Sequence, residues 1–359
     1  MNVTNVKAAT HTYPVYVGKN LRHWTARYLP KTYSSILIVT DETVACHYLE
    51  DVKASLSQET IFSHVIPAGE KSKNIDIFYQ LHTKAIEIGL DRNSLMIALG
   101  GGVVGDVAGF AAATFMRGID FIQMPTTILA HDSSVGGKVA INHEQGKNLI
   151  GNFYAPVAVM YDVSTLTTLT RREIRSGYAE LLKEALLADS NMYQSLIRTD
   201  LSSLTSQKLT DQLTRGIDIK AEIVGADERE ANIRKYLNLG HTLGHALESM
   251  LGYGSRTHGE LVAIGILFTI RVSEKIYAVD LPYEQIYTWL SDNGYPLQWP
   301  SIEPEDILVK MKKDKKTINS TIQMVLLQGI GHPVLLELND DDVLGYLQRF
   351  QQELNYQNE

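Results

Sequence analysis

The most constraining feature of the sequence is a glycine-rich turn, Gly100-Gly101-Gly102-Val103-Val104-Gly105-Asp106. The apolar run 94–99 precedes it and predicts a buried strand, while the small and apolar residues of 103–115 predict a helix. Its glycines have G-x-G-x-x-G spacing, which lets the backbone approach a pyrophosphate at a helix N-terminus. A tight packing turn without a ligand is the alternative. Either way, the chain needs a strand–turn–helix unit here.

Further strand signals precede residue 170. Apolar runs at 34–40, 121–124 and 157–161 predict additional buried strands, and their alternation with helical stretches indicates an α/β domain with a parallel sheet. After about 170 the apolar spacing becomes helical. We expect helices at 171–189, 209–227, 237–251, 258–278, 283–293, 304–313 and 342–354. The sequence therefore predicts an α/β domain over 1–170 and an all-α domain over 171–359.

Bulk composition excludes several partners. The net charge of -8 over 359 residues disfavours a nucleic-acid partner. The longest largely apolar run, 261–270, is too short for a bilayer span of about 20 residues. Residues 1–13 hold no apolar core of signal-peptide length. With Cys46 as the one cysteine, an intrachain disulfide is impossible, and we expect a cytoplasmic protein.

Histidines in the second half suggest a metal site. His241 and His245 are spaced i, i+4, so a helix would present both on one face. Glu180 and His258 lie on other predicted helices and would complete the set. Three N/O ligands with an open position are typical of catalytic zinc. The alternative for any single histidine is an ordinary core or surface residue.

Cationic side chains are gathered in places where an anion would bind. Lys138 and Lys147 lie in glycine-rich stretches, and Lys220 and Arg234 flank an acidic segment at 227–230. The basic run 312–316 follows a predicted helix. Solvated surface charge is the alternative for each lysine. The acidic group expected to bind a ribose is Asp41, which ends the strand at 34–40.

Taken in chain order, a set of short motifs resembles the 3-dehydroquinate synthases, a family of sugar-phosphate cyclases. The match runs from about Asp41 to Lys316, and the ordered set is highly specific although each motif is short. The motifs lie at 67–73, 100–106, 117–118, 125–127, 132–138, 146–148, 179–183, 226–230, 238–245, 258–260 and 314–316. The resemblance implies a Rossmann-like NAD domain followed by a helical metal domain.

The resemblance also implies cofactor-binding residues. It assigns one divalent ion, Zn or Co, to Glu180, His241 and His258, and gives His245 to the substrate. The implied NAD contacts are Asp41, Gly69, Glu70, Lys73, Gly102, Val103, Val104, Gly105, Asp106, Thr126, Thr127, Lys138, Lys147, Thr165, Leu166, Thr167 and Thr168.

The implied substrate is 3-deoxy-D-arabino-heptulosonate 7-phosphate, which would become 3-dehydroquinate. The route comprises transient oxidation with NAD, β-elimination of phosphate, hydride return, ring opening and aldol closure. The implied substrate contacts are Asp132, Lys138, Asn148, Lys183, Lys220, Glu230, Arg234, Asn238, His245 and Lys315. Arg117 matches a residue supplied by a neighbouring subunit, which implies a homodimer.

Three other functions fit parts of the pattern. A related cyclase acting on sedoheptulose 7-phosphate would have no substrate carboxylate for Lys220 and Arg234. A polyol dehydrogenase of the glycerol dehydrogenase type would need fewer cations and would release NADH. A catalytically inactive binding protein would have no need for an intact set of ligands and charges.

Overall fold

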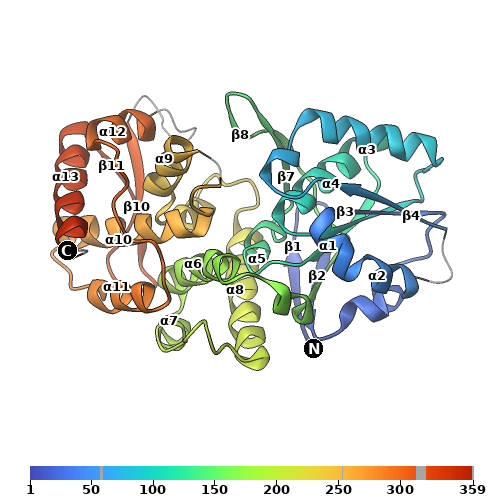
Figure 1. Ribbon diagram of the computed structural model, residues 1–359, viewed down its shortest axis with the longest axis horizontal. Coiled ribbons are helices and arrows are strands. Elements are labelled where there is room, and N and C mark those ends of the chain that lie inside the picture. The colour runs from blue at the N-terminus through green and yellow to red at the C-terminus, as the bar shows by residue number, and fades with distance from the viewer. Residues whose placement is uncertain (57–59, 253, 313–320, 358–359) are drawn as a thin grey trace. The chain divides into compact units, whose positions relative to one another are not determined.

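The computed structural model describes residues 1–56, 60–252, 254–312 and 321–357. The chain divides into two compact units (Figure 1). The first contains Met1–Leu169 and Thr205–Arg229, and the second contains Thr170–Leu204 and Glu230–Glu359. No helix among the described residues is long and apolar enough to cross a bilayer.

The first unit is built on a seven-stranded sheet with the order β1-β2-β9-β6-β5-β3-β4. Strands β9, β6, β5, β3 and β4 pair in parallel, and β2 pairs in parallel with β9 and antiparallel with β1. The predicted parallel sheet is confirmed. Its strands are β1 (Asn2–Lys7), β2 (Thr12–Gly18), β3 (Ile36–Asp41), β4 (Ile61–Ile66), β5 (Leu95–Gly100), β6 (Asp120–Pro125) and β9 (Ala158–Asp162).

Helices cover both faces of this sheet because its central strands are apolar on both sides. Leu37 and Val39 of β3 face the core under α3 and α4, whereas Ile36 and Ile38 face the core under η1, η2 and α2. Figure 1 shows α3 and α4 on one side of the sheet and α2 on the other. The helical elements are η1 (Leu21–Tyr28), α1 (Glu42–Val44), η2 (Ala45–Leu49), α2 (Glu50–Ala54), η3 (Glu70–Ser72), α3 (Ile75–Glu87), α4 (Gly102–Thr114), η4 (Phe115–Arg117), α5 (Ala130–Ser133) and η5 (Val163–Thr168).

A β-hairpin follows α5 and contains the glycine-rich stretches around Lys138 and Lys147. It consists of β7 (Lys138–His143) and β8 (Gly146–Phe153), which pair antiparallel. Strand β7 packs on α4, where a Cβ at Gly109 would lie 2.5 Å from Val139 Cγ1. This close approach explains the small residues of α4, because a larger side chain would push the hairpin away.

Helix α8 (Ser206–Ala226) belongs to the first unit, although the predicted boundary at 170 placed it in the second domain. It packs on β1 and α5. Asn2 Nδ2 donates to Thr214 Oγ1 at 3.0 Å, and Thr4 Oγ1 donates to Asp218 Oδ1 at 2.5 Å. The prediction rested on helical spacing, which identifies a helix but not the core that it covers.

The second unit is helical, as predicted, with one addition. Strands β10 (Ile322–Leu327) and β11 (Pro333–Leu338) form an antiparallel hairpin that the all-α prediction did not include. The central helix is α10, which packs on α6, α9, α11, α13 and β10. The helices are α6 (Arg171–Ala188), α7 (Ser190–Leu196), η6 (Ile233–Asn238), α9 (His241–Leu251), α10 (His258–Tyr277), α11 (Tyr283–Asp292), α12 (Pro304–Lys312) and α13 (Asp340–Gln357).

Candidate active site

Three helices of the second unit bring a carboxylate and two imidazoles together. Glu180 comes from α6, His241 begins α9, and His258 begins α10. Glu180 Oε1 lies 3.5 Å from His241 Nε2 and 3.3 Å from His258 Nε2. Donor atoms around a tetrahedral Zn²⁺ with bonds of 2.0–2.1 Å lie about 3.3 Å apart. The donor set therefore fits one divalent ion.

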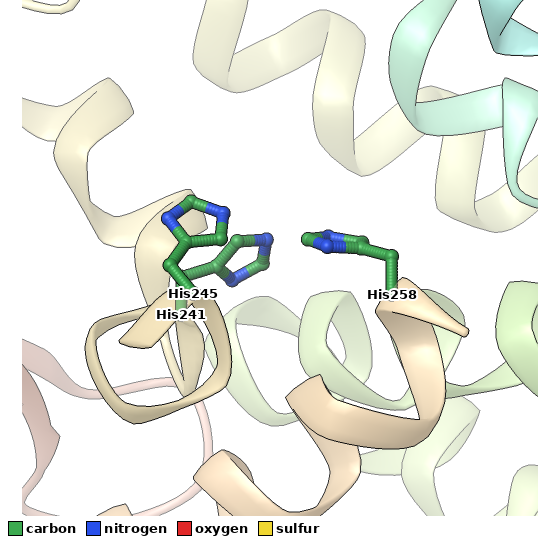
Figure 2. Close-up of side chains that lie close together, drawn as sticks. All are labelled: His241, His245 and His258. Atoms are coloured by element: carbon green, nitrogen blue, oxygen red, sulfur yellow. The ribbon is translucent and has the colours of Figure 1, made fainter. Parts of the chain in front are cut away.

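His245 joins this group from the next turn of α9. The ligand atoms of His241, His245 and His258 all lie within 4.8 Å of one another. Figure 2 shows the two α9 rings next to each other, with the His258 ring reaching toward them from α10. The i, i+4 spacing thus gives the shared helix face expected from the sequence, and His245 is also near enough to contact a ligand bound at the metal.

Backbone contacts between glycines and neighbouring helices set the distances within the site. A Cβ on Gly259 would lie 2.0 Å from the Ser176 carbonyl oxygen, and one on Gly265 would lie 1.9 Å from the Gly240 carbonyl oxygen. Gly240 also has a φ of 77°, which glycine adopts without strain. Helix α10 can therefore approach α6 and the start of α9 only because these positions lack side chains.

A buried carboxylate, Glu260, and two partly exposed arginines fix the start of α10. Glu260 closes a capping box with Thr257. Its carboxylate also accepts hydrogen bonds from Arg175 Nη2 at 2.8 Å and from Arg172 Nε at 3.4 Å. Burial raises the pKa of Glu260, but the hydrogen bonds from Thr257 and Arg175 outweigh it and lower that pKa overall. Since both arginines belong to α6, this group holds the helix that carries Glu180 against the one that begins with His258.

The charges at the site are strongly coupled. Lys183 Nζ lies 2.6 Å from Glu180 Oε2, and both side chains are 1% exposed. Burial lowers the pKa of His258, but hydrogen bonds to Glu180 and Glu248 outweigh it and raise that pKa to about 9. Burial lowers the pKa of His241 well below its usual value. His241 is thus ready as a neutral ligand, whereas His258 must lose a proton to bind a metal.

The glycine turn of the first unit forms an uncapped helix N-terminus. Helix α4 begins at Gly102 after Gly101, and no side chain caps it. A Cβ on Gly102 would lie 3.0 Å from Ser133 Oγ, and one on Gly101 would lie 3.1 Å from Thr127 Cγ2. The exposed N–H groups and the positive end of the helix dipole suit a pyrophosphate.

The turn lies where the strand order reverses. The chain runs from β3 to β4 on one side and then crosses to β5 on the other side of β3. Asp41 ends β3 and Gly100 ends β5, so both lie at the carboxyl edge of the sheet beside this switch point. Asp41 Oδ1 accepts from the backbone N–H groups of Thr43 and Val44, both at 2.9 Å. These residues fit a dinucleotide site.

Other residues of the predicted cofactor set follow the same edge. Gly69, Glu70 and Lys73 come after β4, and Thr126 and Thr127 come after β6. The segment Thr165–Thr168 lies in η5 after β9, where Tyr48 donates to the Thr165 carbonyl oxygen at 2.9 Å.

Hairpin β7–β8 contacts this edge through Asn142 and Lys147. The Lys73 side chain forms an ion pair with Asp106 of α4. The backbone carbonyl oxygen of Lys73 accepts a hydrogen bond from the backbone N–H of Asn142 at 2.8 Å. Glu70 Oε1 accepts from Asn142 Nδ2 at 2.8 Å and lies 3.7 Å from Lys147 Nζ. The structure thus brings together Glu70, Lys73, Asp106 and Lys147, which sequence reasoning could group only through the resemblance.

Some predicted substrate residues lie in the first unit. Lys220 of α8 is buried, and its Nζ lies 2.9 Å from Asp132 Oδ1. Lys138 and Asn148 are exposed on the hairpin, and Asn148 has a φ of 54°. Arg117 is exposed with a φ of 70°, at a corner where Met116 also has a positive φ. This exposed backbone corner is unusual for non-glycine residues.

The remaining predicted substrate residues lie in the second unit. Lys183 and Arg234 are buried, and Asn238 Nδ2 donates to Glu230 Oε1 at 2.9 Å. Glu230 has a φ of 60°. Lys220 and Arg234 belong to different units, so their joint binding of a substrate carboxylate stays a prediction. Lys315 lies outside the described residues.

Sequence reasoning missed the residues that support the metal-binding set. Glu248, Arg175 and Ser176 each contact one of the elements that carry the ligands. Glu248 follows His241 by seven residues, or two helical turns, and this spacing is the one signal that would have identified it.

Comparisons with known proteins identify the family of the chain. The family model described as 3-dehydroquinate synthase N-terminal matches residues 63–176, and the one described as 3-dehydroquinate synthase C-terminal matches residues 177–317. A 3-dehydroquinate synthase of Oceanobacillus iheyensis is 53% identical over 352 residues, covering 98% of each chain. One of Geobacillus kaustophilus is 49% identical, covering 96% of this chain and 97% of its own.

Solved structures share the fold. A 2-deoxy-scyllo-inosose synthase, described in complex with carbaglucose-6-phosphate, NAD+ and Co2+, has a TM-score of 0.87 at 24% identity, covering 97% of this chain and 100% of its own. A 2-epi-5-epi-valiolone synthase of Streptomyces hygroscopicus subsp. jinggangensis 5008 is described with NAD+ and Zn2+. It has a TM-score of 0.84 at 23% identity, and the match covers 98% of this chain and 100% of its own. By its matches to both family models and its near-full-length relatives, the chain belongs to the 3-dehydroquinate synthase family.

Proposed function

We propose that this protein converts 3-deoxy-D-arabino-heptulosonate 7-phosphate to 3-dehydroquinate and phosphate, as a lyase of the shikimate pathway that depends on NAD and a divalent metal. The observation that carries the proposal is the position of Glu180 Oε1 within 3.5 Å of both His241 Nε2 and His258 Nε2. Family membership supplies the substrate, and the geometry supports a site for the required metal.

Two cofactors belong to the proposal. When bound, NAD accepts a hydride from the substrate and returns it, and the divalent ion, Zn or Co, polarises substrate hydroxyl groups. Glu180, His241 and His258 would hold the ion. The uncapped start of α4 would hold the pyrophosphate of NAD, and Asp41 would bind a ribose hydroxyl. The NAD+ and Co2+ or Zn2+ described for the two cyclases of the same fold support the choice of cofactors.

The substrate carries a carboxylate and a phosphate, and each needs charge-assisted partners away from water. Such hydrogen bonds are worth about 1.5–3 kcal/mol each. We assign the carboxylate to Arg234 with Lys220, because a guanidinium binds a carboxylate through two parallel bonds. The proposed phosphate contacts are Arg117, Lys138, Asn148, Asn238, His245 and Lys315.

Three further side chains would act near the reacting carbons. Asp132 orients Lys220 through its ion pair, and Lys183 holds Glu180 Oε2 so that Oε1 faces the imidazoles. Glu230, whose carboxylate accepts from Asn238, or His245 would relay protons in the proposed reaction.

The proposed assembly is a homodimer in which Arg117 completes the site of a second copy. The exposure of Arg117 supports this role, because a residue that reaches a second copy must be accessible at the surface of its own chain. The proposal also includes a cytoplasmic location, which the single cysteine fits.

The deciding experiment mixes the protein with NAD, a divalent metal and the heptulosonate phosphate, and follows phosphate release. We expect release that stops when the metal is chelated and no net change in NADH absorbance at completion. Steady accumulation of NADH without phosphate would identify a polyol dehydrogenase instead. Turnover of sedoheptulose 7-phosphate in preference to the heptulosonate would identify the related cyclase and contradict the role of Arg234.

A further inference from the structure

The imidazole of His258 is held on both of its ring nitrogens. Nε2 lies 3.3 Å from Glu180 Oε1, and Nδ1 lies 3.2 Å from Glu248 Oε2. A carboxylate accepts but does not donate a hydrogen bond, so the hydrogen between Glu248 and the ring resides on Nδ1. Nε2 is then the nitrogen left for a metal.

Glu248 is positioned by the same helix face that supplies a ligand. It follows His241 by seven residues on α9, so both side chains leave the helix in nearly the same direction. Its side chain is 11% exposed, and a carboxylate this far buried requires a partner. Because it contacts the ring on the side opposite Glu180, Glu248 does not belong to the ligand set itself.

His241 is oriented by a comparable contact. Its Nδ1 lies 3.1 Å from the Leu239 carbonyl oxygen, and its Nε2 faces Glu180. Both imidazoles therefore use Nδ1 for an oxygen acceptor and present Nε2 to the same carboxylate oxygen. The acceptor for His241 belongs to the backbone, whereas the acceptor for His258 is a side chain that substitution can remove.

We propose that Glu248 is a positioning residue that fixes the tautomer and ring orientation of His258 for metal binding. The inference rests on the proposed metal site and adds a residue to it. Outer carboxylates of this kind raise metal affinity about 10–100-fold in other proteins. Glu248 acts through His258 and contacts neither the substrate nor the metal.

The test measures Co²⁺ affinity of the metal-stripped protein by competition with a chromophoric chelator, for wild type, Glu248→Ala and Glu248→Gln. The alanine variant should bind about 10–100-fold more weakly. The glutamine variant keeps an oxygen acceptor at the same reach, so it should recover most of the loss. The matched control is Ser249→Ala, an exposed position on the same helix, which should bind as wild type does.

Two further readouts separate positioning from folding. The visible spectrum of bound Co²⁺ should change in Glu248→Ala, and nitrogen NMR of the Zn²⁺-loaded wild type and Glu248→Gln should show Nδ1 of His258 carrying the hydrogen. Wild-type affinity and an unchanged spectrum in Glu248→Ala would overturn the proposal, as would equal losses in both variants. Failure of the wild type to bind Co²⁺ would refute the metal site itself, which is a different result.

Discussion

Gly259 N donates to Ser176 Oγ at 3.1 Å, and a Cβ added to Gly259 would lie only 2.0 Å from the Ser176 carbonyl oxygen, so the start of α10 lies directly against α6. The residue before Gly259 is a proposed metal ligand, and Ser176 lies one helical turn before Glu180. The distance between the two ligands is therefore set by a backbone contact next to them.

This contact predicts that Gly259→Ala damages both stability and metal binding. The added Cβ would lie 2.0 Å from the Ser176 carbonyl oxygen, so α10 must move away from α6. We expect a loss of about 1–3 kcal/mol in the free energy of unfolding, measured with denaturant, and weaker Co²⁺ binding.

Gly345→Ala is the control for a helical glycine in the same unit. Its Cβ would meet only the end of the Arg349 side chain, at 3.6 Å. We expect unchanged metal affinity and a free energy of unfolding that is the same or up to about 1 kcal/mol higher. Equal effects of the two substitutions would show that the Ser176 contact has no special role.

His258→Ala should abolish tight metal binding and phosphate release while the sheet of the first unit stays folded. The side chain is a proposed ligand in the second unit, far in sequence from the strands that form the sheet. Metal content and circular dichroism would be measured together. His332→Ala removes an exposed histidine from the same unit and should retain the metal. Full turnover in metal-stripped His258→Ala would contradict the role.

Metal affinity should rise with pH. The two carboxylates raise the pKa of His258 to about 9, so a proton occupies the metal-free site at neutral pH and must leave when the metal binds. The apparent association constant should increase about tenfold per pH unit between pH 6 and 8 and level off above 9. Calorimetry in buffers of different ionisation enthalpy would count the released proton, and no release at pH 7 would count against this coupling.

Gly102→Val should weaken NAD binding without changing metal affinity. A Cβ at this position would lie 3.0 Å from Ser133 Oγ, and the larger side chain would cover the N–H groups at the start of α4. We expect at least a tenfold loss of NAD affinity by calorimetry. Because the glycine turn and the metal ligands belong to different units, Co²⁺ affinity serves as the internal control.

Arg234→Ala should weaken substrate binding by more than about tenfold, the loss of one charge-assisted hydrogen bond. Binding of the heptulosonate phosphate would be compared with that of an analogue lacking the carboxylate, whose affinity should change far less. Arg229→Ala, at an exposed position five residues earlier in the sequence, is the control. Unchanged heptulosonate affinity in Arg234→Ala would exclude carboxylate recognition by this residue.

The buried elements were predictable from the sequence because their patterns are set by the core. The apolar runs of β3 and β5 have no polar residue until their ends, and each became a central strand. The i, i+4 spacing of His241 and His245 likewise predicted a shared helix face, which the structure confirms. Glu180 and His258 were further candidates from their places on other predicted helices, but spacing does not choose three ligands among four, and the resemblance is what assigns Glu180 to the metal and His245 to the substrate.

The missed features depend on partners that lie far away in sequence. Strand β8 is exposed along most of its length, so it has no apolar pattern, and its position depends on pairing with β7. Glu248 is one acidic residue among many until the fold brings His258 next to it. Long-range contacts of this kind cannot be derived from local periodicity.

The return of α8 to the first unit limits how this protein can be divided. A truncation after Leu169 would remove the helix that covers β1 and α5, together with Lys220, the partner of Asp132. The outer hairpin of the sheet would then expose apolar surface to solvent, and the fragment would be prone to aggregate. An autonomous dinucleotide-binding fragment would therefore have to include residues 205–229, joined by a designed linker.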